Sequence, residues 1–247
     1  MRIEHESVSI TGRRKNNEDA VLAIPEHGLF AVADGMGGYE GGEVASKLAL
    51  SSLRAYCDLL GEDGLGLSEL GNVEGRRVAS ERLGLAIRIA DREVRRRAVG
   101  RLRRMGTTIA CVAVAGEHAL LAHVGDSRVY RLREGEAKAL TRDHSLLNEL
   151  AGTSIGTAQA MRLNSIITQA LGPGGDVQPT LSFQEVLPGD QYLVCSDGLS
   201  DVLDEAKIAW HMASKEGGAQ ALVDAAFAAG SRDNISALVI RVGEDAA

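Results

Sequence analysis

The chain has 247 residues, 45% of them hydrophobic and 25% charged, and its formal net charge is −7 at pH 7. This length fits one large domain, and the acidic balance argues against a general electrostatic attraction to nucleic acid or to an anionic membrane. The N-terminal residues MRIEHESVSI lack the apolar stretch of a secretion signal, and no apolar run is long enough to span a bilayer. The three cysteines have apolar neighbours and no CxxC spacing, which favours reduced, buried thiols. The sequence therefore predicts a cytoplasmic protein, taken to be a monomer, without a nucleic-acid partner.

Eight apolar segments, many of them β-branched and bounded by Gly, Asp or Asn, are predicted to form strands. In chain order they cover residues 3–10, 20–24, 29–33, 107–115, 119–125, 128–133, 191–196 and 235–242. The tripeptides GEH at 116–118 and GDS at 125–127 are short enough to join hairpins. We therefore expect a largely antiparallel sheet.

Between these strands, apolar residues recur with the helical period of 3.6. The predicted helices cover residues 43–60, 79–104, 204–213 and 218–229, and a flexible loop is expected at 61–75. Hairpins separated by long helices favour an α+β fold, with helices layered on antiparallel sheets.

Four aspartates stand at the ends of predicted strands. LFAVADG carries Asp34, LLAHVGDS carries Asp126 and YLVCSDG carries Asp197, each at the C-terminal end of its strand. SRDNISALVIRV places Asp233 just before a strand. Because the end of one antiparallel strand lies beside the start of its neighbour, we expect the four carboxylates to meet at one edge. Taken singly, however, each aspartate is also typical of an ordinary turn.

The glycine-rich turn after Asp34 is unusually acidic for a phosphate-binding loop. Carboxylates gathered without a counter-charge repel each other, and a bound cation removes that penalty. Oxygen ligands without His or Cys are those that Mg²⁺ or Mn²⁺ prefers. Glycine lets the main chain approach closely, so the carbonyl of Gly35 is a further candidate ligand. The pattern therefore predicts a divalent-cation site, with phosphate binding to the cations.

A charged cluster, TGRRKNNEDAVL, precedes the second predicted strand. Arg14 lies in its basic half, and a guanidinium can bind a phosphate through two parallel hydrogen bonds. Glu18 and Asp19 lie in its acidic half and can add oxygen ligands to the cation site. The alternative is a solvated turn with a capping asparagine.

Together these segments resemble the PPM family, the metal-dependent type 2C serine/threonine protein phosphatases, and most of all its compact bacterial members. The resemblance follows the chain in order, through GRRKNNEDA, VADGMGG, MGTTIACV, AHVGDSRVYRL, TRDHSLLNEL, ITQALG, VCSDGLSD and SRDNISALVI. It implies a single phosphatase domain over residues 1–247, with a flap subdomain at about 145–165. It also implies a β-sandwich of two antiparallel sheets flanked by helices on both sides, in four α-β-β-α layers.

The resemblance further implies two divalent ions, Mn²⁺ or Mg²⁺, and a third of the kind often seen in bacterial members. Asp34 would bridge two ions, and the carbonyl of Gly35 would bind one of them. Asp197 and Asp233 would complete the first ion, and Asp126 with Asp197 would hold the third.

The implied reaction is hydrolysis of phosphoserine and phosphothreonine in proteins by a metal-activated water, reversing a bacterial Ser/Thr kinase in signal transduction. Phosphorylated proteins, including that kinase, are the implied partners. Arg14 and Asp34 are the expected catalytic residues, and Arg14 and Asn234 are expected to bind substrate. Met36 stands where many eukaryotic relatives have a histidine, so the proton donor stays open between a metal-bound water and His144, for which a structural role is the alternative.

Two further segments depart from the family pattern. The flap is short and lacks the usual His-Pro pair, which leaves substrate preference open. Residues 92–104, REVRRRAVGRLRR, carry seven arginines and one glutamate. This segment is either the solvated face of a helix or a docking surface for an acidic phosphoprotein.

Two other functions are alternatives to the phosphatase. The first is a catalytically silent pseudophosphatase that binds phosphoproteins, although such proteins usually lose metal-binding aspartates. The second is a regulator that acts on phosphorylated proteins of the anti-anti-sigma type. Cysteine-based phosphatases are excluded because none of the three cysteines is followed by an arginine six residues later.

Overall fold

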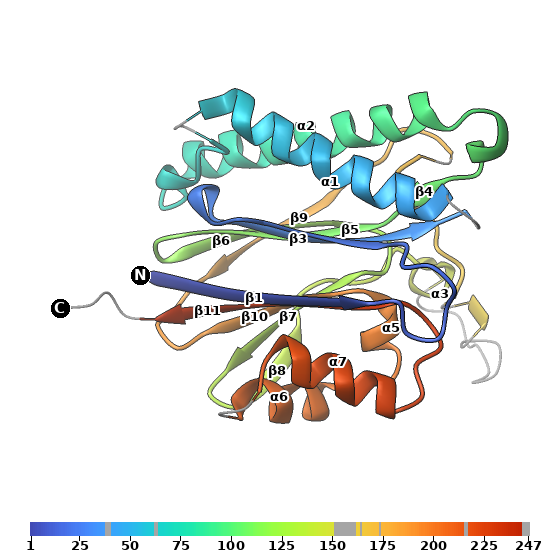
Figure 1. Cartoon of the computed structure of the whole chain (residues 1–247). Helices are drawn as coiled ribbons and strands as arrows, with labels where there is room; N and C mark the ends of the chain where they lie inside the picture. The colour runs from blue at the N-terminus through green and yellow to red at the C-terminus, as the bar shows by residue number, and fades with distance from the viewer. Residues whose placement is uncertain are drawn as a thin grey trace.

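The computed structural model describes residues 1–37, 41–61, 64–150, 162–163, 165–172, 174–214 and 217–243. Within these residues two β-sheets lie face to face, and helices cover the outer face of each sheet (Figure 1). The expected four-layer α-β-β-α sandwich of antiparallel sheets is therefore confirmed. The predicted flap at 145–165 lies mostly outside the described residues.

The strands are all paired in antiparallel fashion within the described chain. Sheet A has the order β1-β11-β10-β7-β8, with bounds Arg2–Ile10, Ile235–Gly243, Gln191–Cys195, Arg128–Arg133 and Glu136–Ala139. Sheet B has the order β2-β3-β5-β6-β9, with bounds Asp19–Ile24, Leu29–Met36, Ile109–Ala115, His118–Val124 and Thr180–Glu185, and the short β4 (Gly106–Thr107) pairs with β3.

Two long helices, α1 (Gly41–Leu60) and α2 (Val73–Arg97), cover sheet B, and α6 (Glu205–Ala213) and α7 (Ala219–Ala228) cover sheet A (Figure 1). The shorter helices are α3 (Leu146–Glu149), α5 (Asp197–Ser200) and the 3₁₀ turns η1 (Pro25–His27), η3 (Leu67–Glu69) and η4 (Gly100–Leu102). None of the helices described here is both long and apolar enough to cross a membrane.

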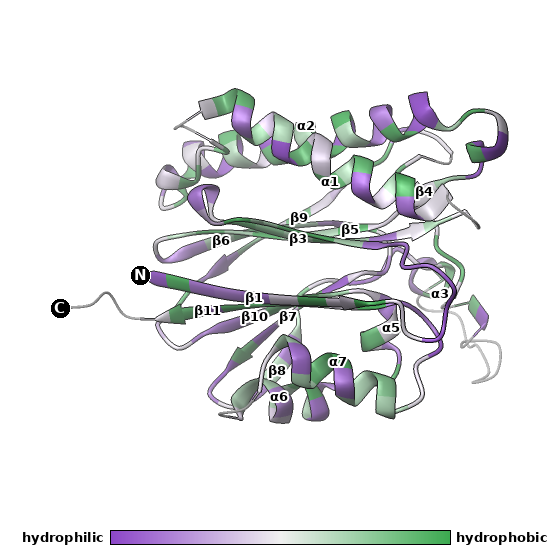
Figure 2. Ribbon diagram, viewed as in Figure 1, coloured by the Kyte–Doolittle hydropathy of each residue, from purple (hydrophilic) through white to green (hydrophobic). Residues whose placement is uncertain are grey.

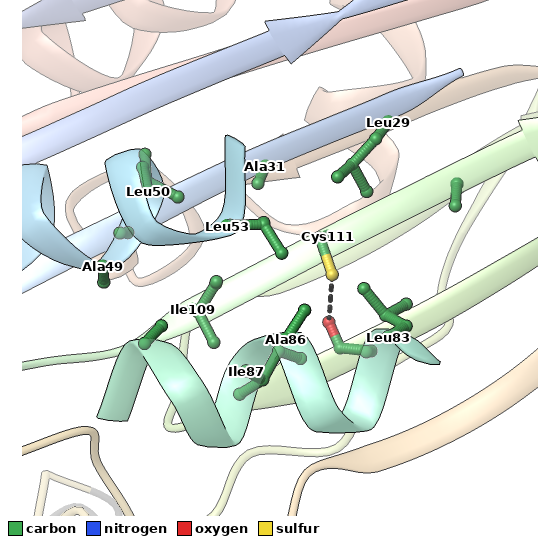
Figure 3. Packing of buried hydrophobic residues seen from close by; sticks show 14 of the residues in the cluster. Leu29, Ala31, Ala49, Leu50, Leu53, Leu83, Ala86, Ile87, Ile109 and Cys111 are labelled. Atoms are coloured by element: carbon green, nitrogen blue, oxygen red, sulfur yellow. Dashed lines mark hydrogen bonds between the residues drawn. The ribbon is translucent and has the colours of Figure 1, made fainter. Parts of the chain in front are cut away.

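Strand alternation sorts the apolar side chains into three buried layers. In β3, Leu29 and Ala31 face the helices, whereas Phe30 and Val32 face the other sheet. Figure 3 shows the helix-side layer, where side chains of α1 and α2 pack on β3 and β5, and where the Cys111 thiol donates to a main-chain carbonyl. Because each central strand is buried on both faces, its sequence is apolar throughout and shows no polar alternation.

One predicted hairpin is wrong, and the error matters for the site. The GEH turn does join neighbouring strands, β5 and β6. The GDS segment at 125–127 instead crosses between the sheets, because β6 lies in sheet B and β7 in sheet A. Gly125 turns the chain there with a φ of 101°, and an added Cβ would lie 2.6 Å from the Thr108 side chain. A left-handed glycine packed this tightly redirects the chain out of its sheet.

Other element boundaries also differ from the expectation. The predicted helix at 79–104 begins earlier, with Asn72 capping its first turn, and ends at Arg97. The expected flexible loop at 61–75 holds the 3₁₀ turn η3, and its leucines pack in the helix-side core. The strands β8 and β9 were not predicted, because exposed residues dilute their apolar pattern.

Candidate metal centre

A cleft of about 820 Å³ is lined by residues from loops of both sheets. These loops lie at the right-hand end of the molecule in Figure 1. Eight of the nine site residues predicted from the sequence line this cleft: Arg14, Glu18, Asp34, Gly35, Asp126, Asp197, Asp233 and Asn234. Lys15, Asn16, Met36, Gly37, Thr108 and Ile167 complete its described lining. The sequence therefore identified most of the wall, although these residues come from opposite ends of the chain.

Strand register places the first two carboxylates next to each other. β2 and β3 pair so that Asp19 lies opposite Asp34. Gly35 follows, with its N–H donating to the carbonyl of Glu18 at 3.1 Å. A Cβ on Gly35 would lie 2.2 Å from the carbonyl oxygen of Gly42, so only glycine fits between β2 and the start of α1. Because Gly35 has no side chain, its main chain borders the cleft directly.

The other carboxylates arrive from three separate strand ends. Asp126 follows β6 in sheet B, whereas Asp197 follows β10 and Asp233 precedes β11 in sheet A. β10 and β11 are antiparallel neighbours, so the end of one meets the start of the other as expected. The sequence predicted that the carboxylates meet at one edge, and in the structure they lie at the shared end of two stacked sheets.

Burial and mutual repulsion make these carboxyls hard to ionise. Burial, followed by repulsion from Asp126 and other carboxylates, raises the pKa of Asp197 to about 8. Burial, followed by repulsion from Asp19 and Asp197, raises the pKa of Asp34 well above its usual range. Burial and the nearby Asp143 raise the pKa of Asp126 to about 6. Ionising such a cluster costs free energy unless a bound cation balances its negative charge.

The buried oxygens of this cluster fit a divalent cation. Oδ1 of Asp126 and Oδ1 of Asp197 are buried and accept no hydrogen bond within the described structure. No group of three or more His, Cys, Asp or Glu side chains among the described residues is close enough to hold an ion by itself. The carboxylates are therefore near enough to shift each other's pKa without closing around one point. An all-oxygen donor set suits Mg²⁺ or Mn²⁺.

Asp19 is the one predicted site residue that does not line the cleft. It is 5% exposed, and its Oδ2 accepts from Ser196 at 2.8 Å and from Ser236 at 2.6 Å. These hydrogen bonds join β2 to sheet A. Burial raises the pKa of Asp19 to about 6, against the lowering effect of the two serines.

Arg14 and Asn234 connect the N-terminal loop to the end of the chain. The Arg14 guanidinium lies 2.6 Å from Oδ2 of Asp233, in an ion pair on the cleft rim. The amide of Asn234 accepts from the N–H of Glu18 and donates to the carbonyls of Thr11 and Asn16. The buried Asn234 thus fixes the loop that carries Arg14.

His144 is not among the residues that line the cleft. Its Nδ1 accepts from the N–H of Gly125 at 3.2 Å, its Nε2 lies 2.9 Å from Oγ1 of Thr180, and its ring stacks on His123. Burial, followed by repulsion from His123, lowers its pKa to about 4. A neutral histidine that is hydrogen-bonded at both nitrogens supports the structural alternative.

Two threonines that received no role from the sequence also support the site. Oγ1 of Thr107 donates to the carbonyl of Asp34 at 2.8 Å, and Oγ1 of Thr108 accepts from the N–H of Asp34 at 3.0 Å. Both main-chain groups of Asp34 are therefore held from β4 and the break before β5. The Gly-Thr-Thr motif was the sequence signal for these threonines, but a motif does not reveal that β3 is the strand beside them.

The layered fold and the oxygen-lined cleft define an α-β-β-α sandwich with a candidate divalent-cation site, and comparisons with known proteins agree. A family model described as protein phosphatase 2C matches residues 9–225. The serine/threonine protein phosphatase PstP of Mycobacterium tuberculosis (strain H37Rv) is 37% identical over 234 residues, which cover 93% of this chain and 43% of that protein. The chain therefore belongs to the protein phosphatase 2C family.

Solved structures match along nearly the whole chain. The catalytic domain of PstP in complex with two manganese ions has a TM-score of 0.82 at 34% identity, covering 98% of this chain and 99% of that one. A structure described as PppA, a key regulatory component of T6SS in Pseudomonas aeruginosa, has a TM-score of 0.82 at 33% identity, covering 98% of each chain. The chain spans less than half of full-length PstP but matches its catalytic domain almost end to end.

Proposed function

We propose that this protein is a metal-dependent protein serine/threonine phosphatase. The observation that carries the proposal is the cluster of carboxylates with raised pKa values and unpartnered buried oxygens, facing a cleft with Arg14 on its rim. The family membership and the manganese reported for the PstP catalytic domain support it. The cofactors are two Mn²⁺ or Mg²⁺ ions, and Asp126 with Asp197 would hold a third.

The proposed metal ligands are oxygen atoms of residues that line the cleft. Asp34 and the carbonyl of Gly35, with Asp197 and Asp233, would hold the two ions. Bound divalent ions supply a nucleophilic water near neutral pH and neutralise charge on the phosphoryl group. Burial raises the pKa of Glu18, whose carboxyl adds oxygen at the cleft, and Asp19 adds negative charge from behind Asp34.

Arg14 is assigned to the phosphoryl group of the substrate. Its guanidinium pairs with Asp233, so it already lies where a negative charge is stabilised. An arginine at this place can orient the phosphate through two hydrogen bonds and stabilise the charge that develops during transfer. Asn234 serves substrate binding by fixing the Arg14 loop.

The substrates are phosphorylated Ser/Thr proteins, with a cognate kinase among them, and the protein acts in cytoplasmic signal transduction as a monomer. The three cysteines are free and buried, and burial raises the pKa of both Cys111 and Cys195 to about 12. Inert thiols of this kind fit a reducing compartment.

The test is hydrolysis of a phosphothreonine peptide and of p-nitrophenyl phosphate, with Mn²⁺ and with EDTA. We expect turnover of both substrates only with the metal, and loss of turnover in Asp34→Asn. Turnover that persists in EDTA, or an unimpaired Asp34→Asn variant, would refute the mechanism. Peptide binding without any turnover would favour the pseudophosphatase instead.

A further inference from the structure

The arginine segment, residues 92–104, is the strongest concentration of positive charge on an otherwise acidic chain. It holds seven of the 27 Lys and Arg residues, in a protein with a net charge of −7. Six of the seven arginines are exposed: Arg92, Arg96, Arg97, Arg101, Arg103 and Arg104. In Figure 2, hydrophilic residues recur among apolar ones at the end of α2 and in the turn after it, at the same end of the molecule as the loops that line the cleft.

Most of this charge is not neutralised inside the described structure. Arg95 pairs with Asp91 and Asp176, and Arg96 pairs with Glu93. Among the described residues, Arg92, Arg97, Arg103 and Arg104 have no ion pair or side-chain hydrogen bond. Four guanidinium groups therefore remain available to a binding partner.

The segment is continuous with the wall of the cleft. Immediately after Arg104, β4 pairs with β3 so that Met36 lies opposite Gly106. A Cβ on Gly37 would lie 2.7 Å from the carbonyl oxygen of Arg104, so the two backbones touch. Met36 and Gly37 both line the cleft. The C-terminal end of the arginine segment, at Arg104, therefore borders the wall of the cleft.

The turn that presents these arginines is firmly anchored. Met105 is 1% exposed, and Leu102 packs against the helix-side core. The N–H of Leu102 donates to the carbonyl of Val99, and the N–H of Met105 donates to the carbonyl of Leu102. A fixed backbone lowers the entropy cost of binding, which distinguishes this surface from a loose charged tail.

We propose that the arginine segment is a docking surface for acidic residues that flank the phosphorylated Ser or Thr of the substrate. The proposal rests on the proposed phosphatase function and names a substrate class for the same site. Carboxylates beside the phosphoresidue would pair with Arg103 and Arg104 while the phosphate occupies the cleft. The occupant is a peptide because the rest of the chain is acidic and would repel a long polyanion such as nucleic acid.

The experiment compares three substrates of the intact protein with Mn²⁺. They are a phosphothreonine peptide flanked by Asp and Glu, the same peptide with Ser and Gly in those positions, and p-nitrophenyl phosphate. The test variant is Arg103→Gln with Arg104→Gln. The matched control is Arg2→Gln with Arg77→Gln, which removes the same charge from the start of β1 and the first turns of α2.

For the acidic peptide, we expect kcat/KM to fall about threefold to tenfold in the test variant, mostly through KM, because exposed ion pairs are individually weak. The neutral peptide and p-nitrophenyl phosphate should change less than twofold, and the control should behave like the wild type. Raising the salt concentration should remove most of the difference. Equal wild-type rates on both peptides, or an unimpaired test variant, would overturn the docking proposal while leaving the phosphatase in place.

A second measurement does not depend on turnover. Anisotropy of a labelled, unphosphorylated acidic peptide should show binding that the test variant weakens and the control retains. This result would support the docking surface even if no substrate were hydrolysed, in which case only the phosphatase proposal fails. Tighter, equally arginine-dependent binding of a single-stranded oligonucleotide would overturn the peptide proposal.

Discussion

The protein holds two kinds of aspartate in two regions, and the difference between them separates structure from function. The clamped aspartates, Asp91, Asp143 and Asp190, each pair with an arginine. In the cleft, Asp34, Asp126 and Asp197 have no ion pair with Lys or Arg in the described part of the chain. The two groups therefore differ in whether the protein supplies an arginine partner.

The clamp at Asp190 shows what a structural solution looks like. Nε and Nη2 of Arg133 each lie 2.7 Å from one of its oxygens, and the N–H of Leu187 adds another hydrogen bond. A clamped carboxylate is satisfied by the protein itself. The cleft carboxylates are not, and burial and repulsion raise the pKa of Asp197 to about 8. Several neighbouring carboxylates that share a cleft without an arginine partner are therefore consistent with a bound cation.

The largest expected effect comes from replacing one aspartate of each kind by asparagine. Asp197→Asn should lower kcat/KM on the order of 10³-fold or more, since it removes a proposed metal ligand. It should also raise the Tm in EDTA, because it removes repulsion. Asp190→Asn should leave the activity of the folded enzyme intact but cost about 3–5 kcal/mol of unfolding free energy. Phosphatase assays and thermal unfolding of both variants check the contrast, and similar behaviour of the two would break it.

The pH dependence of stability should also differ with and without metal. The Asp197 carboxyl titrates near 3.8 when unfolded and at about 8 when folded, so its neutral form stabilises the metal-free protein at low pH. That contribution is lost as the pH rises from about 4 through 8, and the total is on the order of several kcal/mol. Mn²⁺ needs the ionised form, so its stabilising effect should grow over the same range. Thermal unfolding in EDTA and in Mn²⁺ measures both curves, and a flat EDTA profile would contradict the account.

Asp233 combines features of both kinds of aspartate. It pairs with Arg14, and it lines the cleft at the exposed rim. Arg14→Gln should lower kcat/KM about 10²-fold by removing phosphate stabilisation. The variant should bind Mn²⁺ with the same or higher affinity, because it removes the guanidinium that competes with the metal ion for Asp233. Arg13→Gln is the matched control, because Arg13 stacks on Phe227 instead. Calorimetric Mn²⁺ titration separates the two effects, and loss of metal binding in Arg14→Gln would exclude this assignment.

The smallest expected effect on catalysis is at His144. His144→Gln should change kcat/KM less than about threefold, because the histidine lies outside the cleft. It should cost about 1–2 kcal/mol of stability through lost hydrogen bonds to Gly125 and Thr180. If the pH–rate profile of this variant lacks the ionisation of a general acid that the wild type shows, His144 would instead be the proton donor.

Much of the fold and site could be predicted because the relevant signals are local. Apolar runs bounded by Gly and Asp mark strands whether or not their partners are known, and the Asp-Gly pattern drew attention to Asp34 and Asp197. The motif resemblance ordered these signals along the chain. The arginine segment was also visible, but its place beside Gly37 was not.

What the sequence determined by itself is the set of strands and the polar residues at their ends, since backbone preference and side-chain alternation act over a few residues. Only the tertiary structure decided that Gly125–Ser127 crosses between sheets, that Asp19 turns toward Ser196 and that Arg14 meets Asp233, 219 residues away. Those outcomes depend on which strands stack and which charges are then buried together. That choice is made by the packing of the whole chain.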